Sequence, residues 1–131
     1  MTATDQPKAV AAALAHVRAW SNHHFDDARA GLAPDVTVTA VTTEPTRPPT
    51  ARSGIEDYMA GLTSFAAAVV PGSLQVLAAT GDDHNALLTV TVDVDLGAGS
   101  CPLPGARLYR VDDQGRIRAE HVVFYAGTMN G

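Results

Sequence analysis

Residues 71–96, PGSLQVLAATGDDHNALLTVTVDVDL, mark a change in the periodicity of the chain. Pro71 and Gly72 would end a preceding helix, and the residues that follow have the period of two that is typical of half-buried strands. The clearest alternation runs from Thr89 to Leu96, where apolar residues at every second position are separated by Thr89, Thr91, Asp93 and Asp95. The stretch therefore predicts two strands, at about 73–80 and 86–96, joined by a turn at Gly81-Asp82-Asp83.

Downstream, the same period continues to the end of the chain. It predicts two further strands, at about 103–112 and 116–125, connected through Asp113-Gln114. Sequential strands joined by short turns pair antiparallel. Four consecutive strands in this part of the chain therefore predict a mostly antiparallel sheet.

Upstream, helical spacing dominates. Residues 7–21 carry apolar residues three and four apart, residues 25–32 resemble a short second helix, and a capping box of Ser53 and Glu56 would open a third helix that ends at Pro71. A strand after Pro34 (Val36, Val38, Ala40) and a proline-rich loop over 44–50 separate the second helix from the third. The order predicts an α+β fold in which a cone-shaped, curved, mixed or antiparallel sheet wraps around three N-terminal helices.

Composition narrows the class of protein. The chain of 131 residues has the length of one domain, which we expect to span 1–131 with a flexible stretch at 1–6. With 46% apolar and 18% charged residues it is not intrinsically disordered, and a net charge of −5 argues against nucleic acid as a partner. One cysteine, Cys101, precludes an internal disulfide, and no signal peptide or membrane-spanning segment is visible. We expect a cytoplasmic protein that is not associated with membranes.

Four stretches carry a resemblance to a known superfamily: Trp20 to Val38, Arg52-Ser53-Gly54-Ile55, Thr89 to Leu96, and the turn Asp112-Asp113-Gln114-Gly115-Arg116-Ile117. In this order and spacing the chain resembles the nuclear-transport-factor-2-like superfamily, and within it the SnoaL-like, polyketide cyclase-like and ketosteroid-isomerase-like proteins. The resemblance implies a cystatin-like roll whose cone encloses a pocket for a hydrophobic small molecule. It also implies a homodimer, for which we expect the outer sheet face carrying Thr89, Thr91, Asp93 and Asp95 to be the interface.

The catalytic acids of these relatives are missing here. The ketosteroid isomerase base, acid and tyrosine positions correspond to Ala40, Arg107 and Val17, and the cyclase aspartate corresponds to Val122. The usual isomerase and cyclase mechanisms are therefore disfavoured.

The family's geometry predicts which residues face the pocket. Its expected lining is Val17, Trp20, Ala40, Tyr58, Val90, Val92, Val94, Leu96, Tyr109, Val122 and Phe124. Arg107 and Glu120 are also expected to point inward and are the notable ionisable groups among these apolar residues. They are therefore the candidate catalytic residues, with a structural ion pair as the alternative. A two-residue loop at Asp113-Gln114 would place Arg107 directly opposite Glu120, whereas a bulge at Gly115 would place it opposite His121.

The histidines do not form a metal site in the sequence. His16, His23 and His24 lack a third ligand at a suitable spacing, so we interpret them as solvated side chains near the end of the first helix. The hypothesis is an enzyme of the isomerase, cyclase or hydrolase type that needs no metal or organic cofactor. It would act on a hydrophobic cyclic substrate through Glu120 as base or acid and Arg107 as the anion-stabilising group. The alternative is a non-catalytic module that binds a ligand or dimerises.

Overall fold

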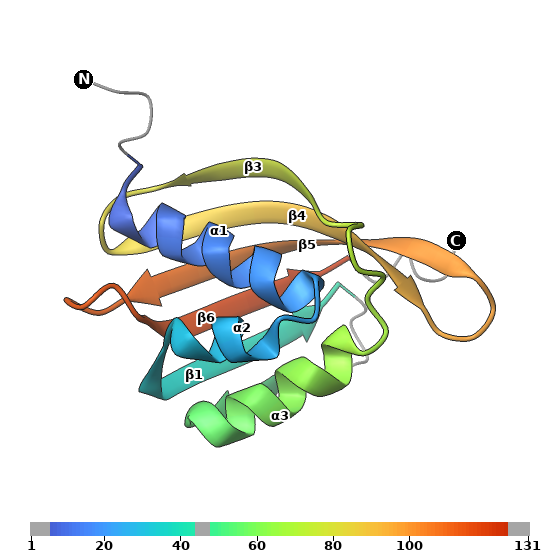
Figure 1. Ribbon diagram of the computed structural model, residues 1–131, viewed down its shortest axis with the longest axis horizontal. Helices are drawn as coiled ribbons and strands as arrows, with labels where there is room; N and C mark the ends of the chain where they lie inside the picture. The colour runs from blue at the N-terminus through green and yellow to red at the C-terminus, as the bar shows by residue number, and fades with distance from the viewer. Residues whose placement is uncertain (1–5, 44–47, 126–131) are drawn as a thin grey trace.

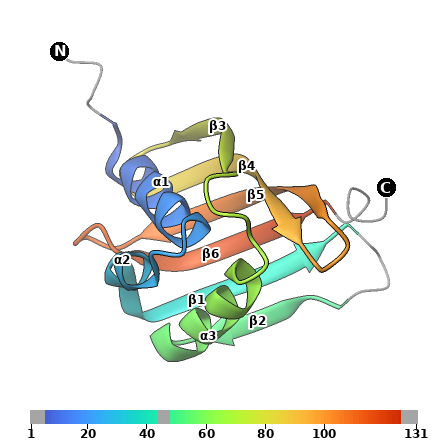
Figure 2. The ribbon, with the colours of Figure 1, turned by 45° about the vertical axis from the view of Figure 1, so that its right-hand side comes forward.

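The computed structural model describes residues 6–43 and 48–125, and within them three helices lie on one face of a six-stranded sheet (Figures 1 and 2). The helices are α1 (Lys8–Ser21), α2 (Phe25–Ala30) and α3 (Ile55–Ala66). The strands are β1 (Leu32–Thr42), β2 (Thr50–Ser53), β3 (Gln75–Gly81), β4 (Asn85–Asp95), β5 (Ser100–Val111) and β6 (Ile117–Phe124). The predicted α+β class is confirmed.

The strand order is β2-β1-β6-β5-β4-β3. Strands that are neighbours in sequence along β3 to β6 pair antiparallel, as their short connections require. The pairing of β1 with β6 is parallel and joins the N-terminal and C-terminal parts of the chain into one mixed sheet. Within the described residues, no helix is long and apolar enough to cross a membrane.

The alternation predicted along β4 is present. Val90, Val92 and Val94 are buried on the inner face, towards the helices, and Thr91 and Asp93 between them lie on the outer face. Leu96 is a correction to the prediction. The strand ends at Asp95, so Leu96 leaves the pleat and is 69% exposed.

The segment before α3 also differs from the prediction. Ser53 is not a helix cap but the last residue of β2, a short strand that the sequence pattern did not indicate. Gly54 precedes the helix with φ of 87°, a conformation that glycine adopts readily and that lets the chain turn sharply. The carboxylate of Asp57 accepts a hydrogen bond from the Ser53 backbone amide (3.2 Å), which fastens β2 to α3.

The predicted register of the β5–β6 hairpin is wrong. Arg107 pairs with Val122, two residues beyond the predicted partner, and Glu120 pairs with Tyr109. One residue of this shift comes from the turn, where the Asp112 carboxylate accepts hydrogen bonds from the backbone amides of Gln114 and Arg116, both at 2.9 Å. The other comes from an irregularity in the strand pairing between Arg110 and Val111. A shift of two residues preserves the side of the sheet, so Arg107 and Glu120 still lie on the same face, as diagonal neighbours.

Candidate functional site

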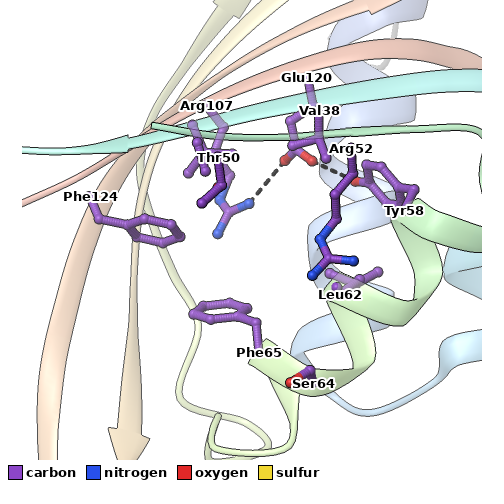
Figure 3. A pocket seen from close by; sticks show the side chains of 13 residues that line it. Val38, Thr50, Arg52, Tyr58, Leu62, Ser64, Phe65, Arg107, Glu120 and Phe124 are labelled. Carbon is purple, nitrogen blue, oxygen red and sulfur yellow. Dashed lines mark hydrogen bonds and ion pairs between the residues drawn. The ribbon is translucent and has the colours of Figure 1, made fainter. Parts of the chain in front are cut away.

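A cavity of about 310 Å³ lies between α3 and the inner face of the sheet (Figure 3). The sheet contributes side chains from β1, β2, β5 and β6, and α3 contributes the opposite wall. The lining residues are Val38, Ala40, Thr50, Arg52, Tyr58, Gly61, Leu62, Ser64, Phe65, Arg107, Glu120, Val122 and Phe124. Most of these residues are apolar, and the charged ones are the neighbours Arg107 and Glu120 and, separately, Arg52.

The structure brings part of the predicted set together. Ala40, Tyr58, Val122 and Phe124 line the cavity with the two candidate catalytic residues. Six others are buried but lie outside the lining: Val17, Trp20, Val90, Val92, Val94 and Tyr109. Val17 and Trp20 belong to α1, and the other four lie on β4 and β5. Helix α1 packs against these strands, and the side chains between them form hydrophobic core. Leu96, which is exposed, is also outside the lining.

Apart from Tyr58, the sequence analysis did not predict the wall supplied by α3 and β2. Leu62 and Phe65 lie three residues apart on one face of α3, but their contact with a cavity depends on how that helix docks. Arg52 was noted only as part of the resemblance. In the structure its side chain lies over Gly61, where a Cβ would come within 2.5 Å of Arg52 Nε, so the glycine makes room for a cation at the cavity.

Arg107 and Glu120 form a buried ion pair. Arg107 Nη1 donates to Glu120 Oε2 at 2.9 Å, and the two side chains are 5% and 3% exposed. Burying either charge alone would cost several kcal/mol, because the group would lose its hydration without gaining a counterion. Arg107 and Glu120 therefore form the structural ion pair that was the alternative prediction, and both side chains also line the cavity.

Aromatic rings surround the guanidinium of Arg107. Its central carbon lies 4.7 Å from the centre of the Trp20 ring, 5.6 Å from Phe124 and 5.9 Å from Phe65. A cation is attracted to the negative faces of such rings. Figure 3 shows the guanidinium beside the Glu120 carboxylate and near the rings of Phe65 and Phe124. The rings thus help to hold a cation in an otherwise apolar place.

The carboxylate of Glu120 has a second partner. Tyr58 donates its hydroxyl proton to Glu120 Oε1 across 2.5 Å, which joins α3 to β6. The Tyr58 oxygen lies also 2.8 Å from His16 Nε2, and His16 Nδ1 lies 3.3 Å from the backbone oxygen of Ala28. A chain of polar contacts thus leads from Arg107 through Glu120 and Tyr58 to His16 on α1.

His16 is a correction to the prediction of a solvated side chain. It is 3% exposed and faces the core. Ala9, Ala13, His16 and Trp20 follow one another at spacings of four, three and four, so they share a helical face. That spacing is present in the sequence, but alanines indicate a buried face less strongly than Val10 and Leu14 do.

The environment shifts the proton affinities within this cluster. Burial by itself would raise the pKa of Glu120, but the charge of Arg107 and the hydrogen bond from Tyr58 outweigh burial and lower it. Burial lowers the pKa of His16, and it raises the pKa of both Tyr58 and Tyr109. Near neutral pH the cluster therefore holds an ionised Glu120, a neutral His16 and two protonated tyrosines.

Three buried donors beside the ion pair have no hydrogen-bond partner within the described part of the chain. They are the indole nitrogen of Trp20, Nε of Arg107 and the hydroxyl of Tyr109. No three His, Cys, Asp or Glu side chains among the described residues lie close enough together to hold a metal ion. The polar groups buried at this site are therefore mainly hydrogen-bond donors, and they lie around the carboxylate of Glu120.

Comparison with known proteins shows the family to which this chain belongs. The sequence matches the family of SnoaL-like domains over residues 13–120. A search of curated proteins finds no significant match. Among solved structures, a protein from Kribbella flavida DSM 17836 is similar with a TM-score of 0.74 and 26% identity, over 92% of this chain and 89% of that one.

Two structures from Mycobacterium tuberculosis share the fold at lower identity. One is an LEH-like epoxide hydrolase, with a TM-score of 0.73 and 20% identity over 94% of this chain and 86% of that one. The other is a protein in complex with estradiol-17beta-hemisuccinate, with a TM-score of 0.73 and 19% identity over 89% of this chain and 93% of that one.

Proposed function

Because the chain belongs to the family of SnoaL-like domains, we propose that its cavity binds a hydrophobic, cyclic small molecule and that Glu120 transfers a proton to or from that molecule. The observation that carries the proposal is an apolar cavity with one buried acid–base cluster in its wall. Ligand pockets in proteins have volumes of about 300–1,000 Å³, so a volume of about 310 Å³ favours a small ligand.

In the enzyme form of the proposal, each residue has one role. Glu120 removes a proton from the ligand, and the electron pair of the broken bond stays on the ligand as an oxyanion. The positive charge of Arg107 stabilises this oxyanion, and Tyr58 orients the carboxylate by its hydrogen bond. Removal of a ligand proton in this way begins isomerisation and cyclisation. In hydrolysis Glu120 instead removes a proton from a water molecule whose oxygen attacks the ligand, and the bond that breaks leaves its electron pair on a ligand oxygen stabilised by Arg107. Neither route uses a metal or an organic cofactor.

The competing function is ligand binding without catalysis. Arg107 already neutralises Glu120 and lowers its pKa, so the carboxylate is a weaker base than an unpaired buried one. The positions at which relatives carry catalytic aspartates are Ala40 and Val122, both in the cavity wall. These observations favour a binding protein if Glu120 proves dispensable.

Two probes test the proposal. Estradiol-17beta-hemisuccinate, the ligand of one similar structure, serves as the binding probe in calorimetry, and cyclohexene oxide serves as a hydrolysis substrate because another similar structure is an epoxide hydrolase. With a ligand that is both bound and turned over, Glu120→Gln should retain affinity and abolish turnover. Turnover that survives Glu120→Gln would contradict the catalytic role of Glu120, and binding without any turnover in the unchanged protein would favour the binding function. A panel of apolar cyclic probes that all fail to bind would contradict both functions.

The matched control is His121→Gln. His121 follows Glu120 directly in β6 but is exposed on the outer face of the sheet, so its replacement should change neither affinity nor turnover. A loss of activity in this variant would show that the effect of Glu120→Gln is not specific to the cavity.

We also propose that the protein is a cytoplasmic homodimer formed through the outer sheet face. Thr89, Thr91 and Asp93 lie on that face, and the cross-strand pair Leu87–Leu108 adds exposed apolar surface to it. Sedimentation equilibrium should give twice the monomer mass at tens of micromolar, and Leu108→Lys should shift it to monomer. A monomer at that concentration would contradict the dimer, and recovery of the protein in a fraction other than cytosol would contradict the location.

A further inference from the structure

The hydroxyl of Tyr58 stands between two hydrogen-bond acceptors. Its oxygen lies 2.5 Å from Glu120 Oε1 on one side and 2.8 Å from His16 Nε2 on the other. All three side chains are buried. A tyrosine hydroxyl has one proton to donate, so the occupancy of both contacts depends on the protons carried by its neighbours.

The far side of His16 determines which ring nitrogen carries a proton. Nδ1 lies 3.3 Å from the backbone oxygen of Ala28, in the last turn of α2, and a carbonyl oxygen can only accept. Nδ1 therefore carries the proton of the neutral ring, and Nε2 is a bare acceptor. Ionised Glu120 is also only an acceptor, so two acceptors compete for the single proton of Tyr58.

We propose that His16 is a positioning residue for Glu120 and that the two residues share one proton through the Tyr58 hydroxyl. When the cluster lacks this proton, the Tyr58 hydroxyl can donate to only one of the two acceptors at a time. Whenever it donates to His16 Nε2, Glu120 Oε1 has no hydrogen bond from Tyr58. The carboxylate then retains more proton affinity than it would if Tyr58 donated to it permanently. The inference rests on the proposed function, because it explains how a carboxylate held by an arginine still works as a base.

Uptake of one proton satisfies every contact in the chain. If the proton is on Glu120, the carboxyl donates to the Tyr58 oxygen and Tyr58 donates to His16 Nε2. If it is on His16, the imidazolium donates to Tyr58 and Tyr58 donates to the ionised carboxylate. In catalysis the proton comes from the ligand, whose bond to hydrogen breaks while the electron pair stays on the ligand beside Arg107. The positive charge gained by the cluster balances the negative charge left on the ligand.

The groups that face His16 leave no other site for this proton. From β5 it is faced by Arg107 and Tyr109, from β6 by Glu120, and from α3 by Tyr58. From α2 the Ala28 backbone oxygen meets the ring. Arginine stays charged throughout the accessible pH range, and both tyrosines are already protonated. Only Glu120 and His16 can take up a further proton.

The test is a titration of the free protein by NMR, with ¹⁵N-labelled histidine and side-chain ¹³C-labelled glutamate. We expect neutral His16 to show the Nδ1–H tautomer, and we expect the His16 ring and the Glu120 carboxyl to titrate with one common midpoint. Tyr58→Phe removes the bridge and retains the ring, so the two midpoints should separate by about one pH unit or more, the coupling at which sites titrate jointly. Glu120→Gln assigns the carboxyl signal.

Tyr109→Phe is the matched control, because it removes a buried hydroxyl that lies near Glu120 but does not stand between Glu120 and His16, as the Tyr58 hydroxyl does. It should leave the midpoints together. The proposal is overturned if neutral His16 carries its proton on Nε2, if the two groups titrate separately in the unchanged protein, if Tyr58→Phe leaves one midpoint, or if Tyr109→Phe separates them as well. Near-ultraviolet circular dichroism verifies that each variant is folded.

The titration needs no ligand, so it can fail or succeed independently of the proposed function. Turnover that survives Glu120→Gln would contradict the catalytic role and leave the shared proton intact. Separate midpoints combined with loss of turnover in Glu120→Gln would contradict the shared proton and leave the catalytic role of Glu120 intact.

Discussion

The inner face of the sheet has two halves that the helices cover differently. Under α1, the side chains of β4 form a closed hydrophobic core, and Ala9 and Ala13 of the helix are fully buried against it. Under α3, the side chains of β1 and β6 border a cavity of about 310 Å³. Both helices have an apolar stripe, so hydrophobic patterning alone does not determine which half is open.

The difference lies in the side chains between helix and sheet. Alanines let α1 approach the valines of β4 closely, and close packing leaves no space larger than a water molecule. On the other side, Gly61 makes room for the Arg52 side chain, and α3 presents the rings of Tyr58 and Phe65. The Arg107–Glu120 pair lies at the border, since Arg107 contacts Trp20 of the closed half and Phe65 of the open one. The charged cluster is thus packed on one side against the closed half, where Arg107 contacts the fully buried ring of Trp20.

The largest expected effect comes from breaking the ion pair at this border. Arg107→Leu alone should lower the free energy of unfolding by about 3–5 kcal/mol, because it leaves the buried carboxylate of Glu120 without a counterion. The double variant Arg107→Leu/Glu120→Leu should recover most of that loss. Urea denaturation of the three proteins measures the difference. A single variant that costs under about 1 kcal/mol would mean that water reaches the pair freely.

Truncation of a leucine in each half compares the two directly. Leu88→Ala in the closed half should cost about 2–5 kcal/mol, since Leu88 is 0% exposed and its removal leaves a new void. Leu62→Ala enlarges an existing cavity at a side chain that is 9% exposed, so its cost should fall at or below about 2 kcal/mol. Equal losses by thermal or urea unfolding would contradict the division into closed and open halves.

Acid should weaken the fold in two steps that both originate at the border. Burial lowers the pKa of His16, so the unfolded chain binds a proton near its ordinary value of about 6.5 before the folded one does, and stability falls below that pH. Arg107 keeps the pKa of Glu120 below its ordinary value of about 4.3, so the stability this carboxylate contributes is present above that pH and is lost as the pH falls further. Each unit of displacement corresponds to about 1.4 kcal/mol.

Urea denaturation between pH 7.5 and 3 measures this dependence. His16→Gln should remove the first step, whereas His24→Gln, at an exposed position after α1, should retain it. Stability that rises as the pH falls from 7 to 5 would have the wrong sign and would contradict the burial of a neutral His16.

The smallest effect on stability is expected at the cavity wall of α3. Gly61→Ala should change the free energy of unfolding by at most about 1 kcal/mol, because the helix propensity of alanine offsets the displacement of the half-exposed Arg52 side chain. Affinity for an anionic cyclic probe should nevertheless fall, since Arg52 leaves its place at the cavity. Gly54→Ala is the contrasting control. Gly54 has φ of 87°, and its replacement should destabilise the fold.

Local periodicity in the sequence was sufficient for the α+β class and for most of the elements. The alternation along β4 and the helical spacing of α1 are local patterns, because each involves residues that are only a few positions apart in the sequence. The shared face of Arg107 and Glu120 followed from parity, which is why it survived a register error of two residues. The error has two sources: hydrogen bonds of Asp112 to Gln114 and Arg116 stabilise a longer turn, and the strand pairing is irregular between Arg110 and Val111.

The tertiary structure alone decided which apolar face became the wall of a cavity and what the buried polar groups contact. Val17 and Val92 follow the same patterns as Leu62 and Val122, yet the first two lie in closed core and the others line the cavity. The contact of His16 with Tyr58 joins residues 42 positions apart, and that of Tyr58 with Glu120 joins residues 62 apart. Periodicity shows which side of an element is buried. The docking of α1 and α3 against the sheet sets the distances across that buried side, and only those distances turn four separate side chains into one hydrogen-bonded cluster.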